Sequence, residues 1–313
     1  MIFITAECSC TLCMNRSMEY INKQMFENFK KTIIKLEDVN INYVSGGSGF
    51  PVLLLHGYPQ THVMWHKIAN QLSEHFTVIA SDLRGYGDSS KPASNESHEP
   101  YSKRRSAQDQ IKLMMSLGYK EFYLVGHDRG GRVGHRMALD YPDNIRKMVV
   151  MDIAPTYTMY TTTDMEFAKA YYHWFFLIQS YDIPERMISN DPRYFLEKKI
   201  GQWGSDSGAF TKEAFNEYLR CFTNETIHAS CEDYRASASI DLQHDQVDID
   251  NDNKIQCPVL CLWGEKGFVG RKYDVIAEWS KWASNVEGYG LPCGHYLPEE
   301  APEAALKALL KFL

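Results

Sequence analysis

What the sequence lacks narrows the classes of function that it could serve. No stretch approaches the roughly 20 consecutive apolar residues that a membrane-spanning helix needs. Basic residues are not in excess, because 33 Lys and Arg stand against 40 Asp and Glu, for a net charge of −7. This balance argues against nucleic acid as a partner. It also means that an anionic substrate must meet local cations that overcome the overall charge.

Paired cysteines are missing as well. Three of the eight cysteines cluster near the start of the chain, but no second pair of Cys or His follows at zinc-finger spacing (Cys8, Cys10, Cys13). The other five are scattered (Cys221, Cys231, Cys257, Cys261, Cys293). We therefore predict reduced cysteines, a cytoplasmic location and no metal site.

The first 24 residues lack the basic segment that opens a secretory signal peptide. We expect residues 1–24 to be a disordered leader, with Met18 or Met25 as alternative starts of the chain.

The rest of the chain alternates strand and helix patterns. Short apolar runs of the kind found in sheets buried on both faces recur, among them PVLLLHG and EFYLVG, and helical stretches follow them. One such stretch, THVMWHKIANQLSE, predicts a helix over residues 61–74. Near the start, TIIKLEDVNINYVSGGSG predicts a hairpin at the edge of the sheet. The alternation predicts an α/β fold with a mostly parallel sheet covered on both faces.

The alternation breaks over residues 157–247, which are rich in aromatic residues and mostly helical in period. It resumes with the apolar run CPVLCLWG. We predict a helical cap domain at 157–247, inserted into a core domain made of residues 25–156 and 248–313.

A tight turn falls between the EFYLVG strand and the next helix. Gly126 and Gly130 flank Asp128 there, in the G-x-nucleophile-x-G pattern of a nucleophile elbow. Small residues at the flanking positions allow the strained turn that lifts the middle side chain above the sheet. A carboxylate in that place would attack an sp³ carbon and form an ester. By this stretch alone, Asp128 could equally be a helix cap.

Two further motifs favour catalysis. LLLHGYP follows the first core strand and predicts an oxyanion hole formed by the backbone N–H groups of Tyr58 and Arg129. PCGHYLP, after the last strand, places His295 where the fold carries its general base. The order of nucleophile, acid and His is that of α/β-hydrolases.

The acid that orients His295 has two candidates. Asp152 ends the strand after the elbow helix, and Glu265 follows the next core strand. Gly267 fills the position where many members of the fold carry an Asp, and Glu265 is out of step with that spacing. We therefore predict Asp152.

Taken together, these motifs resemble those of the fluoroacetate dehalogenases of the α/β-hydrolase fold. The resemblance covers nearly all of residues 30–313. It rests on HGYPQTHVMWHKIA, VIASDLRGYGDSSKP, VGHDRGGRVGHRMALDYPD, MDIAPTY, YYHWFF, CEDYRASASID and GHY.

The resemblance implies roles for particular residues. Arg129 and Arg132 would bind the substrate carboxylate, and three donors would surround the leaving halide (His173, Trp174, Tyr234). It also implies a homodimer. The stretch GEKGFVGRK, residues 264–272, departs most from the family, and we expect it to lie away from these residues.

The predicted activity is hydrolysis of a 2-haloacetate to glycolate and halide through an ester on Asp128, with no metal or organic cofactor. Two alternatives are an epoxide hydrolase and a non-catalytic receptor for a small carboxylate. An epoxide offers no carboxylate to Arg129 and Arg132, and a receptor has no need of Asp128, Asp152 and His295. The aromatic stretch YYHWFF could also be core.

Overall fold

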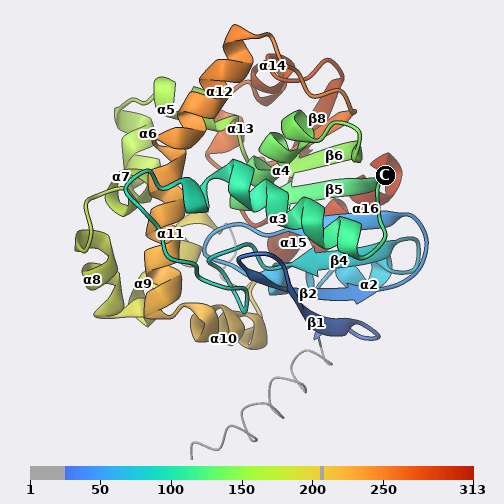
Figure 1. The fold of residues 1–313 in the computed structure, drawn as a ribbon, viewed down its shortest axis with the longest axis horizontal. Helices are drawn as coiled ribbons and strands as arrows, with labels where there is room; N and C mark the ends of the chain where they lie inside the picture. The colour runs from blue at the N-terminus through green and yellow to red at the C-terminus, as the bar shows by residue number, and fades with distance from the viewer. Residues whose placement is uncertain (1–24, 205–207) are drawn as a thin grey trace, which may run out of the picture.

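A computed structural model describes residues 25–204 and 208–313, so the predicted leader at 1–24 lies outside the described residues. Its centre is an eight-stranded sheet with the strand order β1-β2-β4-β3-β5-β6-β7-β8 (Figure 1). The β1–β2 and β2–β4 pairs are antiparallel, and the other neighbouring pairs are parallel. The strands are β1 (Lys30–Lys35), β2 (Asn40–Gly46), β3 (Pro51–Leu55), β4 (Thr77–Ser81), β5 (Phe122–His127), β6 (Ile145–Met151), β7 (Val259–Gly264) and β8 (Val286–Leu291).

Most of the helices outside the β6–β7 interval flank the sheet. They are η1 (His62–Trp65), α2 (Ala69–Leu72), η2 (Glu99–Tyr101), α3 (Lys103–Ser116), α4 (Arg129–Asp140), α13 (Val269–Lys272), α14 (Val275–Ser280), α15 (Leu297–Glu300) and α16 (Pro302–Phe312). A second set falls between β6 and β7. It comprises α5 (Thr156–Thr161), α6 (Met165–Ala170), α7 (Tyr172–Leu177), α8 (Ile183–Ser189), α9 (Pro192–Trp203), α10 (Lys212–Cys221), α11 (Asn224–Ser237) and α12 (Ile240–Asp250).

The two faces of the sheet belong to separate hydrophobic clusters. Leu53 and Leu55 of β3 belong to the cluster that includes side chains of α3, α4 and α14. Val52 and Leu54 belong to the cluster that includes side chains of α2 and α16. Successive side chains of a strand point to opposite faces, so a strand buried on both faces is apolar throughout. The predicted α/β fold with a doubly covered, mostly parallel sheet is confirmed.

The segment after β3 differs from the prediction of one helix over residues 61–74. It forms the short helices η1 and α2 instead. The Thr61 hydroxyl accepts a hydrogen bond from Val63 N, and Asp82, just after β4, accepts one from His62 N at 2.8 Å. These bonds hold the first turn against the end of β4. Between η1 and α2 the backbone bonds run three residues back, as from His66 N to the Val63 oxygen at 2.9 Å, so no continuous α-helix forms.

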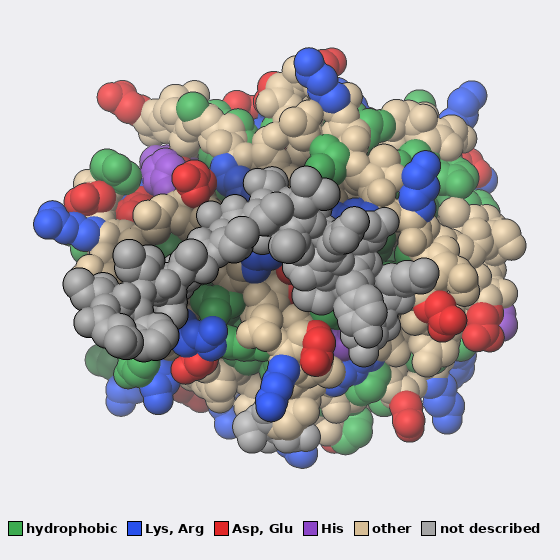
Figure 2. Space-filling model, turned by 90° about the horizontal axis from the view of Figure 1, so that it is seen from below, with side chains coloured by type: hydrophobic (Ala, Val, Ile, Leu, Met, Phe, Trp, Pro, Cys, Tyr) green, Lys and Arg blue, Asp and Glu red, His purple; other side chains and the backbone are tan. Residues whose placement is uncertain are grey.

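The surface carries mixed charge where it can be seen. Figure 2 shows one face of the molecule, on which Lys and Arg side chains are interspersed with Asp and Glu side chains. Within residues 25–204 and 208–313, no helix combines the length and apolar character needed to cross a membrane.

A buried carboxyl group joins α15 to α10. Glu299 accepts a hydrogen bond from the Tyr218 hydroxyl at 2.5 Å, and Lys67 Nζ donates to the Glu299 backbone oxygen at 2.7 Å. Burial raises the pKa of Glu299 to about 8, although Tyr218 and Lys67 act in the opposite direction. Glu299 is therefore mostly protonated at neutral pH in the folded protein.

We expect this carboxyl group to make the fold less stable as the pH rises from about 4.5 to about 8. Folded Glu299 keeps its proton up to about pH 8, whereas the unfolded chain releases it near the ordinary pKa of 4.5. The free energy of unfolding therefore falls as the pH rises across this window. The contribution has an upper limit of about 1.4 kcal/mol per pH unit. Glu299→Gln should flatten this part of the profile. Urea unfolding of both proteins across the window measures the difference, and parallel profiles would contradict the expectation.

Candidate active site

Asp128 occupies a strained turn between β5 and α4. Its backbone has φ 45° and ψ −115°, a conformation that residues other than glycine rarely adopt. A Cβ atom at Gly126 would lie 2.5 Å from the Gly130 carbonyl oxygen, and one at Gly130 would lie 2.4 Å from the Leu55 carbonyl oxygen. The flanking positions therefore admit only glycine, as in a nucleophile elbow.

The Asp128 side chain does not cap α4. Its Oδ1 accepts a hydrogen bond from Tyr58 N at 2.9 Å, and Oδ2 is buried without a hydrogen-bond partner among the described residues. Burial acts to raise the pKa of Asp128, but nearby positive groups, His295 and Arg132 foremost, hold it below its ordinary value. The carboxylate is thus ionised, desolvated and without a hydrogen-bond partner from the described residues on one oxygen, which suits a nucleophile.

The two N–H groups predicted for the oxyanion hole differ in their contacts. Tyr58 N reaches Asp128 Oδ1, the atom on which an oxyanion would form during hydrolysis of an Asp128 ester. In the described part of the chain, the Arg129 N–H makes no hydrogen bond to the Asp128 carboxylate.

His295 and Asp152 lie together on the carboxyl side of the sheet. His295 Nδ1 is 2.6 Å from Asp152 Oδ2, and Asp152 Oδ1 accepts a hydrogen bond from Gly264 N at 2.9 Å. The bond to Asp152 orients the imidazole ring and leaves proton transfer to Nε2. Asp152, not the exposed Glu265, is thus the carboxylate that contacts His295.

Arg129 is buried and paired with a carboxylate from α11. Its Nε donates to Asp233 Oδ2 at 2.6 Å, and its Nη2 donates to the Asp233 backbone oxygen at 2.8 Å and to Ser237 Oγ at 2.5 Å. The guanidinium group also lies over the ring of Tyr234, 4.1 Å from the centroid. Nη1 is buried without a hydrogen-bond partner among the described residues, so it is the atom with capacity for a further bond.

Arg132 is buried too, but its contacts are with neutral groups. Nη1 donates to the Ala154 backbone oxygen at 3.1 Å and to Thr156 Oγ1 at 3.0 Å. The guanidinium lies over the ring of Trp174, 4.7 Å from the centroid. Within the described residues it forms no ion pair, and burial lowers its pKa while Asp128 opposes that shift. Both arginines are internal, which excludes a solvated helix face.

The three predicted halide donors come together above α4. The ring centroids of His173 and Tyr234 are 5.6 Å apart, and those of Trp174 and Tyr234 are 6.2 Å apart. Trp174 Nε1 and the Tyr234 hydroxyl are buried and have no hydrogen-bond partner among the described residues. A purely structural aromatic cluster normally pairs such donors. Burial holds the pKa of His173 well below its ordinary value, and the Lys199 cation adds to that shift.

Two residues of this region are absent from the sequence predictions. Asp233 binds Arg129, and its other carboxylate oxygen contacts Lys103 Nζ. Lys199 of α9 is fully buried, with Nζ 5.0 Å from the centroid of the Tyr172 ring, and burial lowers its pKa well below the ordinary value while Asp128 raises it. A signal for Asp233 exists in CEDYRAS, where it precedes Tyr234; the sequence gives no comparable signal for Lys199.

The segment 264–272 does not lie away from the site, so that expectation is wrong. Gly264 N binds Asp152 Oδ1, and a Cβ atom at Gly267 would lie 3.3 Å from the same oxygen. The reason is topological, because β7 pairs in parallel with β6 and their carboxyl ends meet at one edge.

Among the described residues, no cluster of three or more His, Cys, Asp and Glu side chains could hold a metal ion.

Comparison with known proteins places this site in a family. Residues 51–302 match the family model of the alpha/beta hydrolase fold. The chain belongs to the α/β-hydrolase family. This α/β-hydrolase is 42% identical to fluoroacetate dehalogenase of Burkholderia sp over 291 residues, which cover 92% of this chain and 95% of that protein. The resemblance to the fluoroacetate dehalogenases is therefore confirmed.

Other relatives of this α/β-hydrolase carry different names. It is 33% identical to soluble epoxide hydrolase of Corynebacterium sp., over 87% of this chain and 93% of that protein. The crystal structure of ALR0039, an α/β-hydrolase candidate from Nostoc sp, has 59% identity and a TM-score of 0.90. The match covers 92% of this chain and 98% of the chain of ALR0039.

We expect Asp233→Asn to destabilise the α/β-hydrolase by about 3–5 kcal/mol, because it leaves Arg129 as a buried cation without its counter-ion and leaves Lys103 with only the more distant Asp241, at 3.6 Å. Asp252→Asn, at an exposed aspartate, is the matched control and should change the free energy of unfolding by less than about 0.5 kcal/mol. Urea unfolding at neutral pH measures both. A loss for Asp233→Asn no larger than that of the control would show that the pair does not stabilise the fold.

Proposed function

We propose that this chain hydrolyses 2-haloacetates, such as fluoroacetate or chloroacetate, to glycolate and halide. The observation that carries the proposal is an ionised Asp128 in a strained elbow beside two buried arginines. Ordinary carboxylates would not approach one another closely, and the two cations offset that repulsion. The similarity to fluoroacetate dehalogenase of Burkholderia sp supports a hydrolase acting on carbon–halide bonds.

The proposed first step is displacement at carbon. Arg132 and Arg129 Nη1 hold the substrate carboxylate, which aims the α-carbon at Asp128. An Asp128 oxygen forms a bond to that carbon as the carbon–halogen bond breaks, and the halide leaves with the electron pair. The N–H of Trp174 and the hydroxyl of Tyr234, together with His173, stabilise the developing halide charge.

The proposed second step is hydrolysis of the ester. His295 takes a proton from water, and the resulting hydroxide attacks the carbonyl carbon of the Asp128 side chain. The oxyanion accepts a hydrogen bond from Tyr58 N. Its collapse breaks the ester bond, and His295 returns the proton to the departing alkoxide oxygen, which releases glycolate and restores the Asp128 carboxylate. Asp152 stabilises the imidazolium that forms on His295. The chemistry as written needs no metal or organic cofactor.

Epoxide hydrolysis is the second candidate, favoured by the similarity to soluble epoxide hydrolase of Corynebacterium sp.. An epoxide hydrolase needs cap tyrosines that protonate the epoxide oxygen, and the buried Tyr234 hydroxyl could serve as one. An epoxide offers no carboxylate, however, and would leave buried Arg132 without an anionic partner.

We further propose the setting in which the enzyme works. Residues 157–247 would be a cap domain over a core of 25–156 and 248–313. The family resemblance supports a homodimer. The five cysteines within the described residues are free and buried, in keeping with a reducing compartment such as the cytoplasm (Cys221, Cys231, Cys257, Cys261, Cys293).

A panel of fluoroacetate, chloroacetate and a small epoxide tests the proposal, with free halide and diol measured as products. We expect halide release from the haloacids, unaffected by a chelator, and no diol. Diol formation without halide release would support the epoxide hydrolase instead, and binding of chloroacetate without turnover would support a receptor.

We expect His295→Asn to complete the first step and then stall, because displacement needs no base whereas hydrolysis does. Intact-protein mass spectrometry after chloroacetate treatment should show one added glycolyl group on the peptide that holds Asp128. Asp128→Asn, which lacks the negative charge, is the control and should show none. Release of one equivalent of halide from an unmodified His295→Asn protein would mean that water attacks the carbon directly.

We expect Trp174→Phe to slow fluoride release by at least about tenfold, with a smaller effect on chloride release. Phenylalanine keeps much of the bulk but loses the N–H donor, and fluoride depends more on hydrogen bonds. Trp279→Phe is a matched control, because Trp279 Nε1 donates to the Ile153 backbone oxygen at 3.0 Å, outside the halide cluster. The control should leave the ratio of the two rates unchanged. Equal losses for both halides in Trp174→Phe would assign Trp174 to packing.

A further inference from the structure

A cavity of about 220 Å³ lies beside His295 and Asp152. Tyr171 and Phe268 contribute to its walls, and the segment after β7 supplies two further lining residues, Lys266 and Arg271. A single water molecule needs only about 10–15 Å³ of such space, so the cavity has room for a two-carbon acid. The cavity borders the catalytic pair directly. Neither Lys266 nor Arg271 has a role in the reaction steps proposed above.

The two cations of this cavity have no ion pair within the described residues, and both are exposed. Their neighbour Lys272 differs, because its ammonium group contacts both Asp164 and Glu166. Lys272 thus pairs with Asp164 and Glu166, whereas Lys266 and Arg271 are left to bind an external anion.

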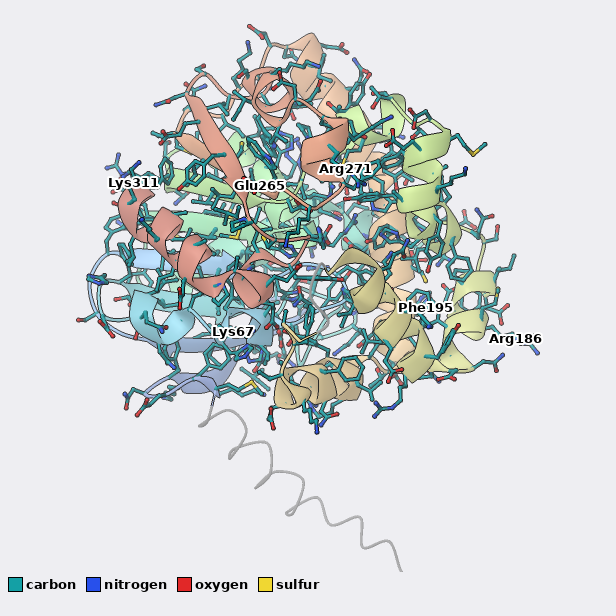
Figure 3. All side chains as sticks on the ribbon, turned by 180° about the vertical axis from the view of Figure 1, so that it is seen from behind. Lys67, Arg186, Phe195, Glu265, Arg271 and Lys311 are labelled. Atoms are coloured by element: carbon teal, nitrogen blue, oxygen red, sulfur yellow. The ribbon has the colours of Figure 1, made fainter. Side chains whose placement is uncertain are left out.

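Glu265, the one acid of the segment 264–272, does not offset the positive charge of Lys266 and Arg271 from within the cavity. Glu265 lies against β8, where a Cβ atom at Gly290 would come within 2.6 Å of Glu265 Cγ, and it does not line the cavity. Figure 3 labels Glu265 and Arg271 on this side of the molecule, with Lys311 apart from them on α16.

We propose that this cavity admits the anionic substrate and releases the glycolate product, and that Lys266 and Arg271 concentrate carboxylates at its mouth. The inference rests on the function proposed above. A chain with net charge −7 repels small anions on average. Asp152 also lines the cavity, but it is engaged by His295, so the remaining charged side chains of the lining are both cations. Such a cleft reverses the tendency locally, because its low-dielectric walls focus the field.

Paired substitutions test the inference. We expect the double variant Lys266→Gln/Arg271→Gln to raise KM for chloroacetate about three- to tenfold at low ionic strength, with kcat changed less than about twofold. The difference should shrink at about 0.3 M salt, where charges are screened beyond a few ångströms. The control Lys307→Gln/Lys311→Gln removes the same two charges from exposed positions on α16 and should leave KM unchanged.

Each outcome separates this inference from the proposed function. Equal KM values and equal salt dependence in the two double variants overturn the inference. A fall in kcat for Lys266→Gln/Arg271→Gln also overturns it, because the segment would then act by supporting Asp152. If the unmodified enzyme releases no halide from any haloacid, the proposed function fails. Calorimetric titration with glycolate then decides the inference, which requires weaker binding by the cavity variant than by the control.

Discussion

Two guanidinium groups are buried at the start of α4 beside a carboxylate, and the helices above the sheet are arranged around their charge. Removing an ion from water costs several kcal/mol even after the protein relaxes, so each buried charge needs compensation. Arg129 obtains it from Asp233 of α11 and in turn shares that aspartate with Lys103. Among the described residues, Arg132 obtains neutral partners, namely two oxygens, the sulfur of Met159 and an aromatic face. The two arginines therefore differ, because Arg129 has a carboxylate as its counter-ion and Arg132 has none among the described residues.

Local periodicity predicts the layers of this fold but not every element. Apolar runs with no polar alternation indicate strands covered on both faces, and the two clusters that divide β3 between them bear this out. The segment from Thr61 to Glu74 has a helical period and still does not form one helix. The His62 N–H donates to Asp82, a residue that the sequence pattern cannot place beside it, and the next backbone bonds run three residues back instead of four.

The same limit applies to the site. Glycine spacing identifies the turn at Asp128, because the turn itself brings the Gly130 carbonyl oxygen within 2.5 Å of a Cβ atom at Gly126. The clash that excludes a Cβ atom at Gly130 involves Leu55 of β3 and depends on the sheet. The burial of Lys199 and the pairing of Asp233 depend on which helices meet, and a charged residue on a helix usually faces solvent. The position of the segment after β7 follows from the strand order, because neighbouring parallel strands have their carboxyl ends at the same edge of the sheet. The sequence pattern does not show that β7 lies beside β6, so it could not place this segment next to Asp152.

Under the proposed function, Arg132 would link substrate binding to the lifetime of the protein. A carboxylate that binds the folded chain and not the unfolded one stabilises the fold by mass action, and here it would also supply the counter-ion that the described residues do not give. Such an enzyme resists unfolding and proteolysis best while its acid is abundant. The amount of folded protein in a cell would then follow the supply of haloacid, without any change in the synthesis of the chain.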